Sequence, residues 1–418
     1  MELRHKQFGL AAKPAAGHPD VSIVMPCLDE VQSLPHCIGN ALEALARLRT
    51  EQGLSGEIVI ADNGSTDGSQ ALATELGARV VPVSRRGYGA ALIGGCEGAL
   101  GRYIVMGDCD GSYDFTEGVA MVAKLEEGFE LCMGSRFKGG ISPGAMPWKN
   151  RYIGNPALTG ILNLFFRSGI SDAHCGLRAI RKRAFLRLGL TSSGMEFASE
   201  MVIKSALLKF RTAEVPATLS PDLRERAPHL RPWRDGWRHL RYLLMLAPKW
   251  LFGLPSLAAL LLGAIILGQS AMQYLAPGSF PSVGDYWTII GSALLEIGHL
   301  ALILTVAGQI YALRAGYRAP GKITRAIGRM ATLEHALVAG LAGVAAGATV
   351  LGLVYAGWVQ RDYAMAESVF PPVFGALLVT VGIQTMLGGF LLAIVSGNEA
   401  RFVPEDAAVL PERDRTLV

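Results

Sequence analysis

The sequence is poor in charged residues and carries no strong excess of either sign. Asp, Glu, Lys and Arg make up only 18% of its 418 residues, and the formal net charge at pH 7 is +4. Proteins that bind nucleic acid through its phosphate backbone need clustered basic charge, so nucleic acid is not an expected partner. Residues 1–20 also lack the apolar core of a cleavable signal peptide, and we expect a flexible N-terminus there.

The six cysteines lack the paired spacing of a zinc site, because no Cys-x-x-Cys occurs. Disulfide frameworks belong to oxidising compartments, and nothing in the spacing of these residues indicates one. All six lie in the first half of the chain, which we therefore expect to face a reducing compartment. They are Cys27, Cys37, Cys96, Cys109, Cys132 and Cys175.

Long uncharged apolar runs dominate the chain beyond residue 250. A helix that crosses a bilayer needs about 20 mostly apolar residues, and four runs can supply them. Four buried core helices of this length in succession are the less favoured alternative. We predict a transmembrane domain over residues 250–397, with helices at about 250–274, 287–313, 334–360 and 369–396.

Basic residues gather on one side of the predicted helices. Residues 224–249 and 314–329 are rich in Arg and Lys, whereas residues 276–286 and 361–367 hold one basic residue between them. By the positive-inside rule, we expect both termini, including a tail at 398–418, in the cytoplasm. The protein is therefore predicted to be an integral protein of a bacterial or archaeal cell membrane.

Polar residues in the second half of the sequence lie at two places of interest, residues 231–249 and the pair Glu296 and His299. Residues 231–249 interleave Trp233, Trp237 and Tyr242 with arginines, which predicts an amphipathic helix in the plane of the lipid headgroups. Glu296 and His299 interrupt the second apolar run and should face the interior of the helix bundle, because charge is costly in lipid. A structural contact is the favoured interpretation for this pair, and a functional role stays open.

Strand and helix signals alternate through residues 21–230. Buried-strand patterns such as "VSIVMP", "EIVIAD" and "RYIVMGD" are followed by helical patterns, which predicts an α/β domain with a mostly parallel sheet covered on both faces. Ligands of such sheets bind beyond the carboxyl ends of the strands. Polar clusters follow these three strands and "ELCMGSR", so we expect a binding site at that edge.

Three aspartates follow the run "RYIV" within the stretch "MGDCDGSYDF". Asp108 and Asp110 are two residues apart, so in extended chain their side chains point to one side. Two close carboxylates raise each other's pKa unless a cation intervenes, and hard oxygen ligands suit Mg²⁺ or Mn²⁺ bridged to substrate phosphates. We predict a metal site here rather than a solvated acidic turn; for Asp114, a helix cap and a functional role both stay open.

Further polar clusters supply candidate ligand contacts. Asp62, at the end of "EIVIAD", suits hydrogen bonding to a base or ribose, while Thr66 and Asp67 equally suit a helix N-cap. The glycine-rich "RRGYGAALIGG" lacks the GKS or GKT of a P-loop, but it lets the backbone approach phosphates. A basic group, each member of which could also be a surface cation, suits a phosphate-binding wall. Its members are Arg136, Lys149, Arg151, His174 and Arg178.

Together these motifs resemble family 2 glycosyltransferases of GT-A fold, in particular the dolichyl- and polyprenyl-phosphate hexose synthases. The resemblance covers about residues 20–245 and rests on "VSIVMPCLDE", "ADNGSTDGS", "GYGAALIGG", "GDCDGSYD", "GSRFKGG", "DAHCGLRAI" and "GMEFASE". It implies a GT-A domain at 21–230 that transfers one hexose, with inversion, from a nucleotide sugar to a polyprenyl or dolichyl monophosphate. UDP-glucose is the favoured donor and GDP-mannose the alternative.

The resemblance also implies roles for individual residues. Donor binding falls on Pro26, Leu28, Glu30, Asp62, Asn63, Ser65, Gly87, Tyr88, Gly89 and Asp108. Asp108 and Asp110 are the implied ligands of Mg²⁺ or Mn²⁺, and catalysis falls on these two with Arg136 and Arg178. The acceptor phosphate falls on Ser135, Arg136, Arg151, His174, Arg178 and Arg226.

The expected acceptor needs little chemical activation. A phosphate monoester has a second pKa of about 6 and is mostly ionised near neutral pH, so arginines that position it matter more than a general base. Glu196 and Glu200 are candidate bases or residues of a helix surface. Membrane lipids are further expected partners, and homo-oligomer formation stays open. The alternatives are a processive polysaccharide synthase, whose Gln-x-x-Arg-Trp motif is missing, and an inactive membrane scaffold.

Overall fold

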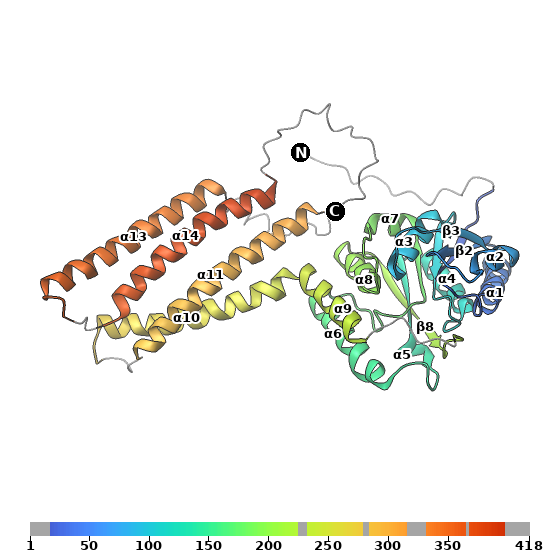
Figure 1. The fold of residues 1–418 in the computed structure, drawn as a ribbon, viewed down its shortest axis with the longest axis horizontal. Coiled ribbons are helices and arrows are strands. Elements are labelled where there is room, and N and C mark those ends of the chain that lie inside the picture. The colour runs from blue at the N-terminus through green and yellow to red at the C-terminus, as the bar shows by residue number, and fades with distance from the viewer. Residues whose placement is uncertain (1–16, 225–231, 279–283, 316–331, 365–367, 398–418) are drawn as a thin grey trace, which may run out of the picture. The chain divides into compact units, whose positions relative to one another are not determined.

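A computed structural model describes residues 17–224, 232–278, 284–315, 332–364 and 368–397. The chain divides into two compact units, Met1–Leu246 and Ala247–Val418. Figure 1 shows an α/β unit built around a sheet and a second unit of long helices. Each unit is described by itself.

The first unit is organised by an eight-stranded sheet within residues 17–224, in the order β3-β2-β1-β4-β7-β5-β8-β6. Strand β7 runs antiparallel to β4 and β5, and the other neighbours pair in parallel. The predicted mostly parallel sheet is therefore confirmed. The strands are β1 (Val21–Cys27), β2 (Gly56–Asp62), β3 (Arg79–Pro82), β4 (Tyr103–Met106), β5 (Leu131–Ser135), β6 (Gly140–Ile141), β7 (Arg178–Arg181) and β8 (Thr212–Leu219).

Helices cover both faces of this sheet because β1 alternates apolar side chains between the two. Ile23 and Met25 join the core cluster with α1 on one face, whereas Val24 faces α3, where Gly95 allows close approach. The helices are α1 (Leu34–Gln52), α2 (Ser69–Glu75), α3 (Tyr88–Gly98), α4 (Gly118–Glu126), α5 (Arg136–Gly139), α6 (Asn155–Phe166), α7 (Lys182–Leu188), α8 (Phe197–Leu207) and α9 (Pro232–Leu246). Two short segments, η1 (Phe115–Glu117) and η2 (Asn150–Gly154), complete the unit.

The second unit contains four helices long and apolar enough to cross a membrane, among the described residues. They are α10 (Leu254–Leu275), which follows η3 (Lys249–Gly253), α11 (Asp285–Arg314), α13 (Leu333–Gln360) and α14 (Phe370–Ser396). The four predicted apolar runs all form such helices, so the chain is an integral membrane protein.

Glycines and one histidine account for the packing of these helices. A Cβ atom on Gly340 would lie 2.6 Å from the carbonyl oxygen of Gly382, so α13 and α14 meet backbone to backbone. The imidazole of His299 lies 3.0 Å from Oε1 of Gln384 and 3.3 Å from the hydroxyl of Thr385, both on α14. The prediction that His299 makes a polar contact inside the bundle is confirmed, and Glu296 is half-buried one turn away.

Candidate functional site

A cleft of about 430 Å³ opens at the carboxyl ends of β1, β2 and β4. It is at the sheet edge where the polar clusters of the sequence predicted a binding site. Several residues expected to bind donor or metal line it: Pro26, Leu28, Glu30, Asn63, Gly87, Tyr88, Asp108 and Asp110. Six further lining residues were not predicted to bind donor or metal: Cys27, Arg86, Ala91, Cys109, Met195 and Arg224.

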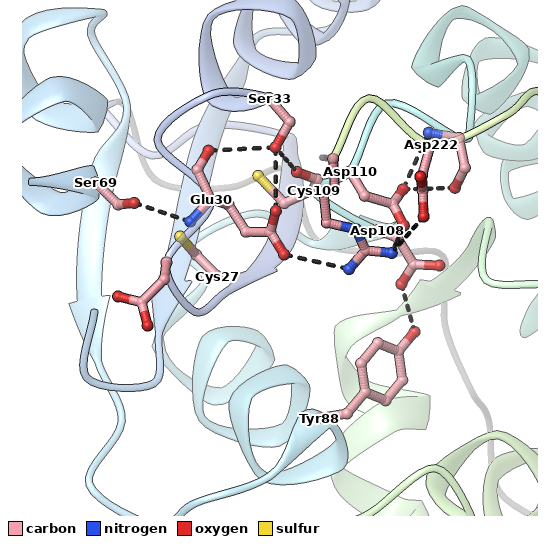
Figure 2. A network of polar contacts seen from close by, with 12 residues as sticks. Cys27, Glu30, Ser33, Ser69, Tyr88, Asp108, Cys109, Asp110 and Asp222 are labelled. Atoms are coloured by element: carbon pink, nitrogen blue, oxygen red, sulfur yellow. Dashed lines mark hydrogen bonds and ion pairs between the residues drawn. The ribbon is translucent and has the colours of Figure 1, made fainter. Parts of the chain in front are cut away.

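Asp108 follows β4 and is held by Tyr88, whose hydroxyl donates a 2.8 Å hydrogen bond to Oδ1 (Figure 2). Burial, together with the neighbouring charge of Asp110, raises the pKa of Asp108 to about 6. The hydrogen bond from Tyr88 and the positive charge of Arg224 act in the opposite direction. A carboxylate in this setting gains from a cation, because the cation offsets both burial and repulsion.

Asp110 has one oxygen used by its own turn and one facing a cation. Its Oδ1 accepts hydrogen bonds from the backbone N–H and the hydroxyl of Ser112, at 3.0 and 2.6 Å. Its Oδ2 lies 2.7 Å from the guanidinium of Arg224. The same guanidinium also lies 3.1 Å from Asp222 and 3.4 Å from Glu30. Figure 2 shows the carboxylates of Glu30, Asp110 and Asp222 turned toward one place.

The segment that carries Arg224 is bound to the aspartate turn by its backbone. The N–H of Leu223 donates to the carbonyl of Asp110 at 2.8 Å, and that of Ser220 donates to the carbonyl of Ser112 at 2.9 Å. These bonds bring Arg224 over a carboxylate 114 positions earlier in the chain. The sequence placed Arg224 only in a basic stretch before the membrane, because no local spacing signals such a contact. The acidic cluster itself was the available signal, since buried carboxylates need a partner.

The carboxylates of the cleft suit a divalent ion only when other ligands complete its coordination. Among the described residues, no three His, Cys, Asp or Glu side chains are arranged to hold a metal by themselves. Mg²⁺ is commonly held by one or two carboxylates together with substrate phosphates and water. Asp108 and Asp110 lining one cleft fit that arrangement, and the guanidinium on Asp110 shows that a positive group is accommodated there.

Three expected donor contacts lie behind the cleft and not in its lining. The carboxylate of Asp62 accepts hydrogen bonds from the N–H groups of Gly64 and Ser65, at 3.0 and 3.2 Å, and from Gln70 at 2.6 Å. Ser65 accepts the N–H of Asp29 at 2.9 Å, and Gly89 packs against the backbone of residues 192–194. Asp62 thus satisfies the turn that follows it, Asn63-Gly64-Ser65, and its direct contact with the donor stays a prediction.

Asn63 connects two walls of the cleft. Its Nδ2 donates to the carbonyls of Val83 and Arg85, at 3.0 and 2.8 Å, and its Oδ1 accepts the N–H of Gly87 at 2.7 Å. The glycine-rich turn is therefore hydrogen-bonded to the end of β2.

Asp114 caps η1, because its Oδ1 accepts the N–H of Thr116 at 2.8 Å.

The predicted phosphate-binding wall is largely a buried scaffold. Arg136 makes a bidentate pair with Asp172, both distances being 2.7 Å. Arg178 donates to the carbonyls of Cys175 and Ala198, at 2.7 and 3.1 Å. Arg136 and Arg178 are 8% and 2% exposed, and neither lines the cleft. These two residues hold the loop between Asp172 and Arg178, and the phosphate contact expected of them stays a prediction.

Two smaller residues of the predicted acceptor-phosphate set, Ser135 and His174, are also engaged inside the protein. Ser135 is fully buried and pairs with the hydroxyl of Ser171 at 2.9 Å. The ring of His174 lies 3.3 Å from the hydroxyl of Ser199, which in turn lies 2.8 Å from Nδ1 of His239 on α9. Burial, next to the ring of His239, holds the pKa of His174 well below its usual value, so this contact is between neutral groups.

Arg151 and Lys149 differ from the other members of the wall because they lie on an exposed aromatic segment. The guanidinium of Arg151 is over the ring of Tyr152, 5.5 Å from the centroid, and Lys149 is over Trp148 at 5.8 Å. Trp148 and Tyr152 are 62% and 69% exposed. The helix that follows, α6, packs against α9 within the same unit. The predicted contact of Arg226 lies outside the described residues.

The two glutamates considered as bases do not line the cleft. Glu200 is fully buried, pairs with Lys204 at 2.6 Å and accepts the N–H of Ser192 at 2.8 Å. Burial acts to raise the pKa of Glu200, but the contacts with Lys204 and Ser192 hold it below its usual value. Glu196 accepts the N–H of Gly194 at 3.3 Å. Both contribute to the loop before α8.

Comparison with known proteins identifies the family of the chain. Residues 22–189 match glycosyl transferase family 2, and residues 306–396 match the glycosyltransferase family 2 C-terminal transmembrane region. The low-salt glycan biosynthesis hexosyltransferase Agl6 of Haloferax volcanii is 33% identical over 377 residues, which cover 90% of this chain and 88% of that protein. The chain therefore belongs to glycosyltransferase family 2.

Two further proteins resemble parts of the chain. The polyprenol monophosphomannose synthase of Mycolicibacterium smegmatis is 27% identical over 231 residues, 51% of this chain and 83% of that protein. The glucosyl-3-phosphoglycerate synthase of Mycobacterium tuberculosis, crystallised with Mn²⁺, UDP and glucosyl-3-phosphoglycerate, is 20% identical. It covers 55% of this chain and 78% of its own, with a TM-score of 0.40. The family and the observed sheet confirm the predicted fold class, a GT-A domain followed by a helical transmembrane domain.

Proposed function

We propose that this glycosyltransferase moves one hexose, with inversion, from a nucleotide sugar to a polyprenyl monophosphate at the cytoplasmic face of the membrane. The observation that carries the proposal is the pair Asp108 and Asp110 in the cleft at the sheet edge, with a guanidinium already on Asp110. A leaving nucleoside diphosphate needs positive charge at this place. The names of the relatives support the lipid acceptor, since one is a polyprenol monophosphomannose synthase.

The donor is proposed to lie along the lining of the cleft. Pro26, Leu28 and Glu30 would contact the nucleotide, and Gly87 and Tyr88 would border its phosphates. UDP-glucose is the preferred donor and GDP-mannose the alternative. Asp62, Ser65 and Gly89 would support these contacts from behind, through the turn that Asp62 organises.

Asp108 and Asp110 are the proposed ligands of Mg²⁺ or Mn²⁺. Such an ion, when bound with the donor, would offset the negative charge that builds on the departing diphosphate. Tyr88 holds Asp108 in place through its 2.8 Å hydrogen bond, and Ser112 fixes the rotation of Asp110. These contacts keep both carboxylates directed while the donor enters and leaves.

The acceptor phosphate is proposed to approach from the exposed segment around Arg151. Its phosphate is already mostly ionised near neutral pH, because its second pKa is about 6, so no side chain needs to remove a proton. Trp148 and Tyr152 suit the boundary between headgroups and acyl chains, where aromatic rings with a polar edge are favoured. Arg226 remains a proposed contact beyond the described residues.

The test is transfer of a radiolabelled hexose by the full-length protein, with polyprenyl monophosphate and Mn²⁺ in detergent. The expected product is a lipid carrying one sugar, extractable into organic solvent. A polymer would identify a processive synthase instead, and the absence of transfer from both nucleotide sugars would indicate a scaffold.

Two variants of one turn sharpen this test. Asp110→Asn is expected to lose activity by about a hundredfold or more, because an amide is a poor ligand and carries no charge. Asp114→Asn is the matched control, since Asn caps a helix as well as Asp does. Asp114 caps η1 and accepts a hydrogen bond from Asn40, and an Asn side-chain oxygen can accept the same bonds. Equal activity in both variants would refute the metal role of Asp110.

A further inference from the structure

A second cavity, of about 760 Å³, lies inside the second unit, among the ends of its long helices. We call it the membrane cavity. The end of α10 and the beginning of α11 line one wall, and the end of α13 and the beginning of α14 line the other. Figure 1 shows these four helix ends on the same side of the helical unit. Sites that bind small molecules have volumes of about 300–1,000 Å³, so the membrane cavity is large enough for a sugar phosphate.

The membrane cavity lies far from the point where the chain enters this unit. The chain enters at η3, directly before α10, whereas the cavity is lined by residues at the other end of α10. With 22 residues at a rise of about 1.5 Å each, α10 separates the two ends by about 33 Å, close to the hydrocarbon thickness of a bilayer. The distribution of basic residues predicts that the chain enters from the cytoplasm. The cavity is therefore expected at the face of the membrane opposite to the proposed transfer.

The membrane cavity contains the single basic residue of the two connections expected at that face. Residues 276–286 and 361–367 hold only Arg361, and Arg361 lines the cavity. Its Nε donates to the carbonyl of Gly357, one turn earlier, at 3.1 Å, and it forms no ion pair among the described residues. Basic residues are depleted at this face, so membrane topology does not account for Arg361. A guanidinium beside a cavity is suited to a phosphate group.

The other polar side chains of the lining suit a ligand that also has hydroxyl groups. Asp285, in the first turn of α11, and Gln273, near the end of α10, both line the cavity. A carboxylate would repel a ligand that offered only an anion, but it accepts hydrogen bonds from hydroxyl groups. The hydroxyls of Ser270 and Thr288, 2.9 Å apart, join α10 to α11 in the same wall.

Aromatic rings close the membrane cavity between its two walls. The ring of Tyr274 on α10 lies 5.5 Å from that of Phe370 on α14, at an interplanar angle of 32°. Phe374 lies one turn further along α14 and also lines the cavity. Binding sites for small molecules combine such apolar surfaces with a few polar groups that fix orientation. The C–H groups of a hexose ring offer a matching apolar face.

We propose that the membrane cavity binds the phosphohexose head group of the glycosylated lipid in the leaflet opposite to the transfer reaction. Arg361 contacts the phosphodiester, Asp285 and Gln273 accept or donate hydrogen bonds to the sugar hydroxyls, and the aromatic rings pack against the sugar. The inference rests on the proposed function, because the ligand is the product of that reaction. It gives the second unit a ligand of its own in addition to its role as an anchor.

The experiment uses a photoreactive probe, farnesyl phosphoglucose with a diazirine on its first isoprenyl unit. Full-length protein in detergent is mixed with the probe, irradiated and digested, and the labelled peptides are mapped by mass spectrometry. A phosphomannose probe with the same chain is used in parallel, because GDP-mannose is the alternative donor. We expect label within residues 270–278 or 368–374. Excess unlabelled farnesyl phosphoglucose should abolish this label, whereas the same excess of phosphatidylglycerol should leave it.

Two variants remove the polar groups of the membrane cavity. Arg361→Gln and Asp285→Asn should each lower the probe affinity measured by this label by about tenfold, the effect of losing one hydrogen bond to a charged group. Asp362→Asn is one matched control, because Asp362 neighbours Arg361 outside the lining and Asn tolerates its positive φ of 51°. Arg314→Gln is the other, because Arg314 is at the opposite end of α11 and donates to the carbonyl of Val395. Both controls should label as the natural protein does.

Three results would overturn the proposal: no label within these residues, equal label in both cavity variants, or equal competition by phosphatidylglycerol, which would identify a site for ordinary anionic lipid. Unchanged thermal unfolding midpoints establish that each variant is folded, and the competition experiment needs no variant. Cavity label without hexose transfer from either nucleotide sugar would refute the proposed function and leave the binding site. Transfer without cavity label would refute the binding site alone.

Discussion

Replacing Arg224 with Met should make the empty site bind Mn²⁺ more tightly. The guanidinium lies 2.7 Å from Asp110, 3.1 Å from Asp222 and 3.4 Å from Glu30. A metal that uses the same oxygen of Asp110 must first displace this cation. Met retains most of the side-chain volume and removes only the charge and the donors, so the change isolates the competition.

The size of the effect follows from the contact that has to break. A hydrogen bond to a charged group contributes about 1.5–3 kcal/mol, and the Arg224 side chain is only 17% exposed, so solvent screens it weakly. Each 1.4 kcal/mol corresponds to about a tenfold change in affinity. We therefore expect Arg224→Met to raise the Mn²⁺ affinity of the nucleotide-free protein about tenfold to a hundredfold.

The assay is the electron paramagnetic resonance signal of free Mn²⁺, titrated into full-length protein well above the pKa of Asp108. Arg86→Met is the matched control, because Arg86 also lines the cleft but donates to the backbone carbonyl of Asn63 and not to a carboxylate. Unchanged or weaker Mn²⁺ binding in Arg224→Met, with Arg86→Met equal to the natural protein, would refute the competition.

Three more predictions follow from contacts in the two units. The pKa of Asp108 is raised to about 6, and a metal binds the ionised carboxylate. Mn²⁺ affinity measured by calorimetry should therefore be constant above about pH 7 and fall as the pH drops through 6. An affinity that stays constant from pH 7 to about pH 5 would contradict this. Arg136→Met removes the ion-pair partner of the fully buried Asp172 and should lower the free energy of unfolding by about 3–5 kcal/mol. The thermal unfolding midpoint should fall accordingly. Arg47→Met, which removes the exposed partner of Glu51, should leave the midpoint unchanged. Gly340→Ala should destabilise the membrane unit by about 1–3 kcal/mol, because its Cβ meets the backbone of Gly382 at 2.6 Å, while Gly352→Ala on the same helix meets nothing within 4 Å and should unfold at or above the natural temperature.

Predictions from local sequence patterns were correct where the environment of a residue depends on its near neighbours in the chain. The runs "VSIVMP" and "EIVIAD" form buried strands, and the four apolar runs form four membrane-length helices. Asp108 and Asp110, which follow "RYIV", line the cleft, because a strand end in a parallel sheet directs polar side chains to the edge where ligands bind.

Local pattern failed for residues whose roles depend on a distant partner. Arg136 and Arg178 have the residue type of a phosphate site, yet Asp172 and backbone carbonyls engage both guanidiniums inside the protein. In each case an inward partner and an outward ligand offer the same hydrogen-bonding chemistry, and only packing selects between them.

The amino-acid order by itself determined strands β1, β2, β4 and β5, the four membrane helices, and which strand end carries paired carboxylates. These follow from hydrophobic period and length, which act over a few turns or residues of chain. Tertiary structure alone brought Arg224 onto Asp110, across 114 positions of the chain. Such a contact depends on how whole strands and helices pack, because residues far apart in the chain meet only after the sheet has formed.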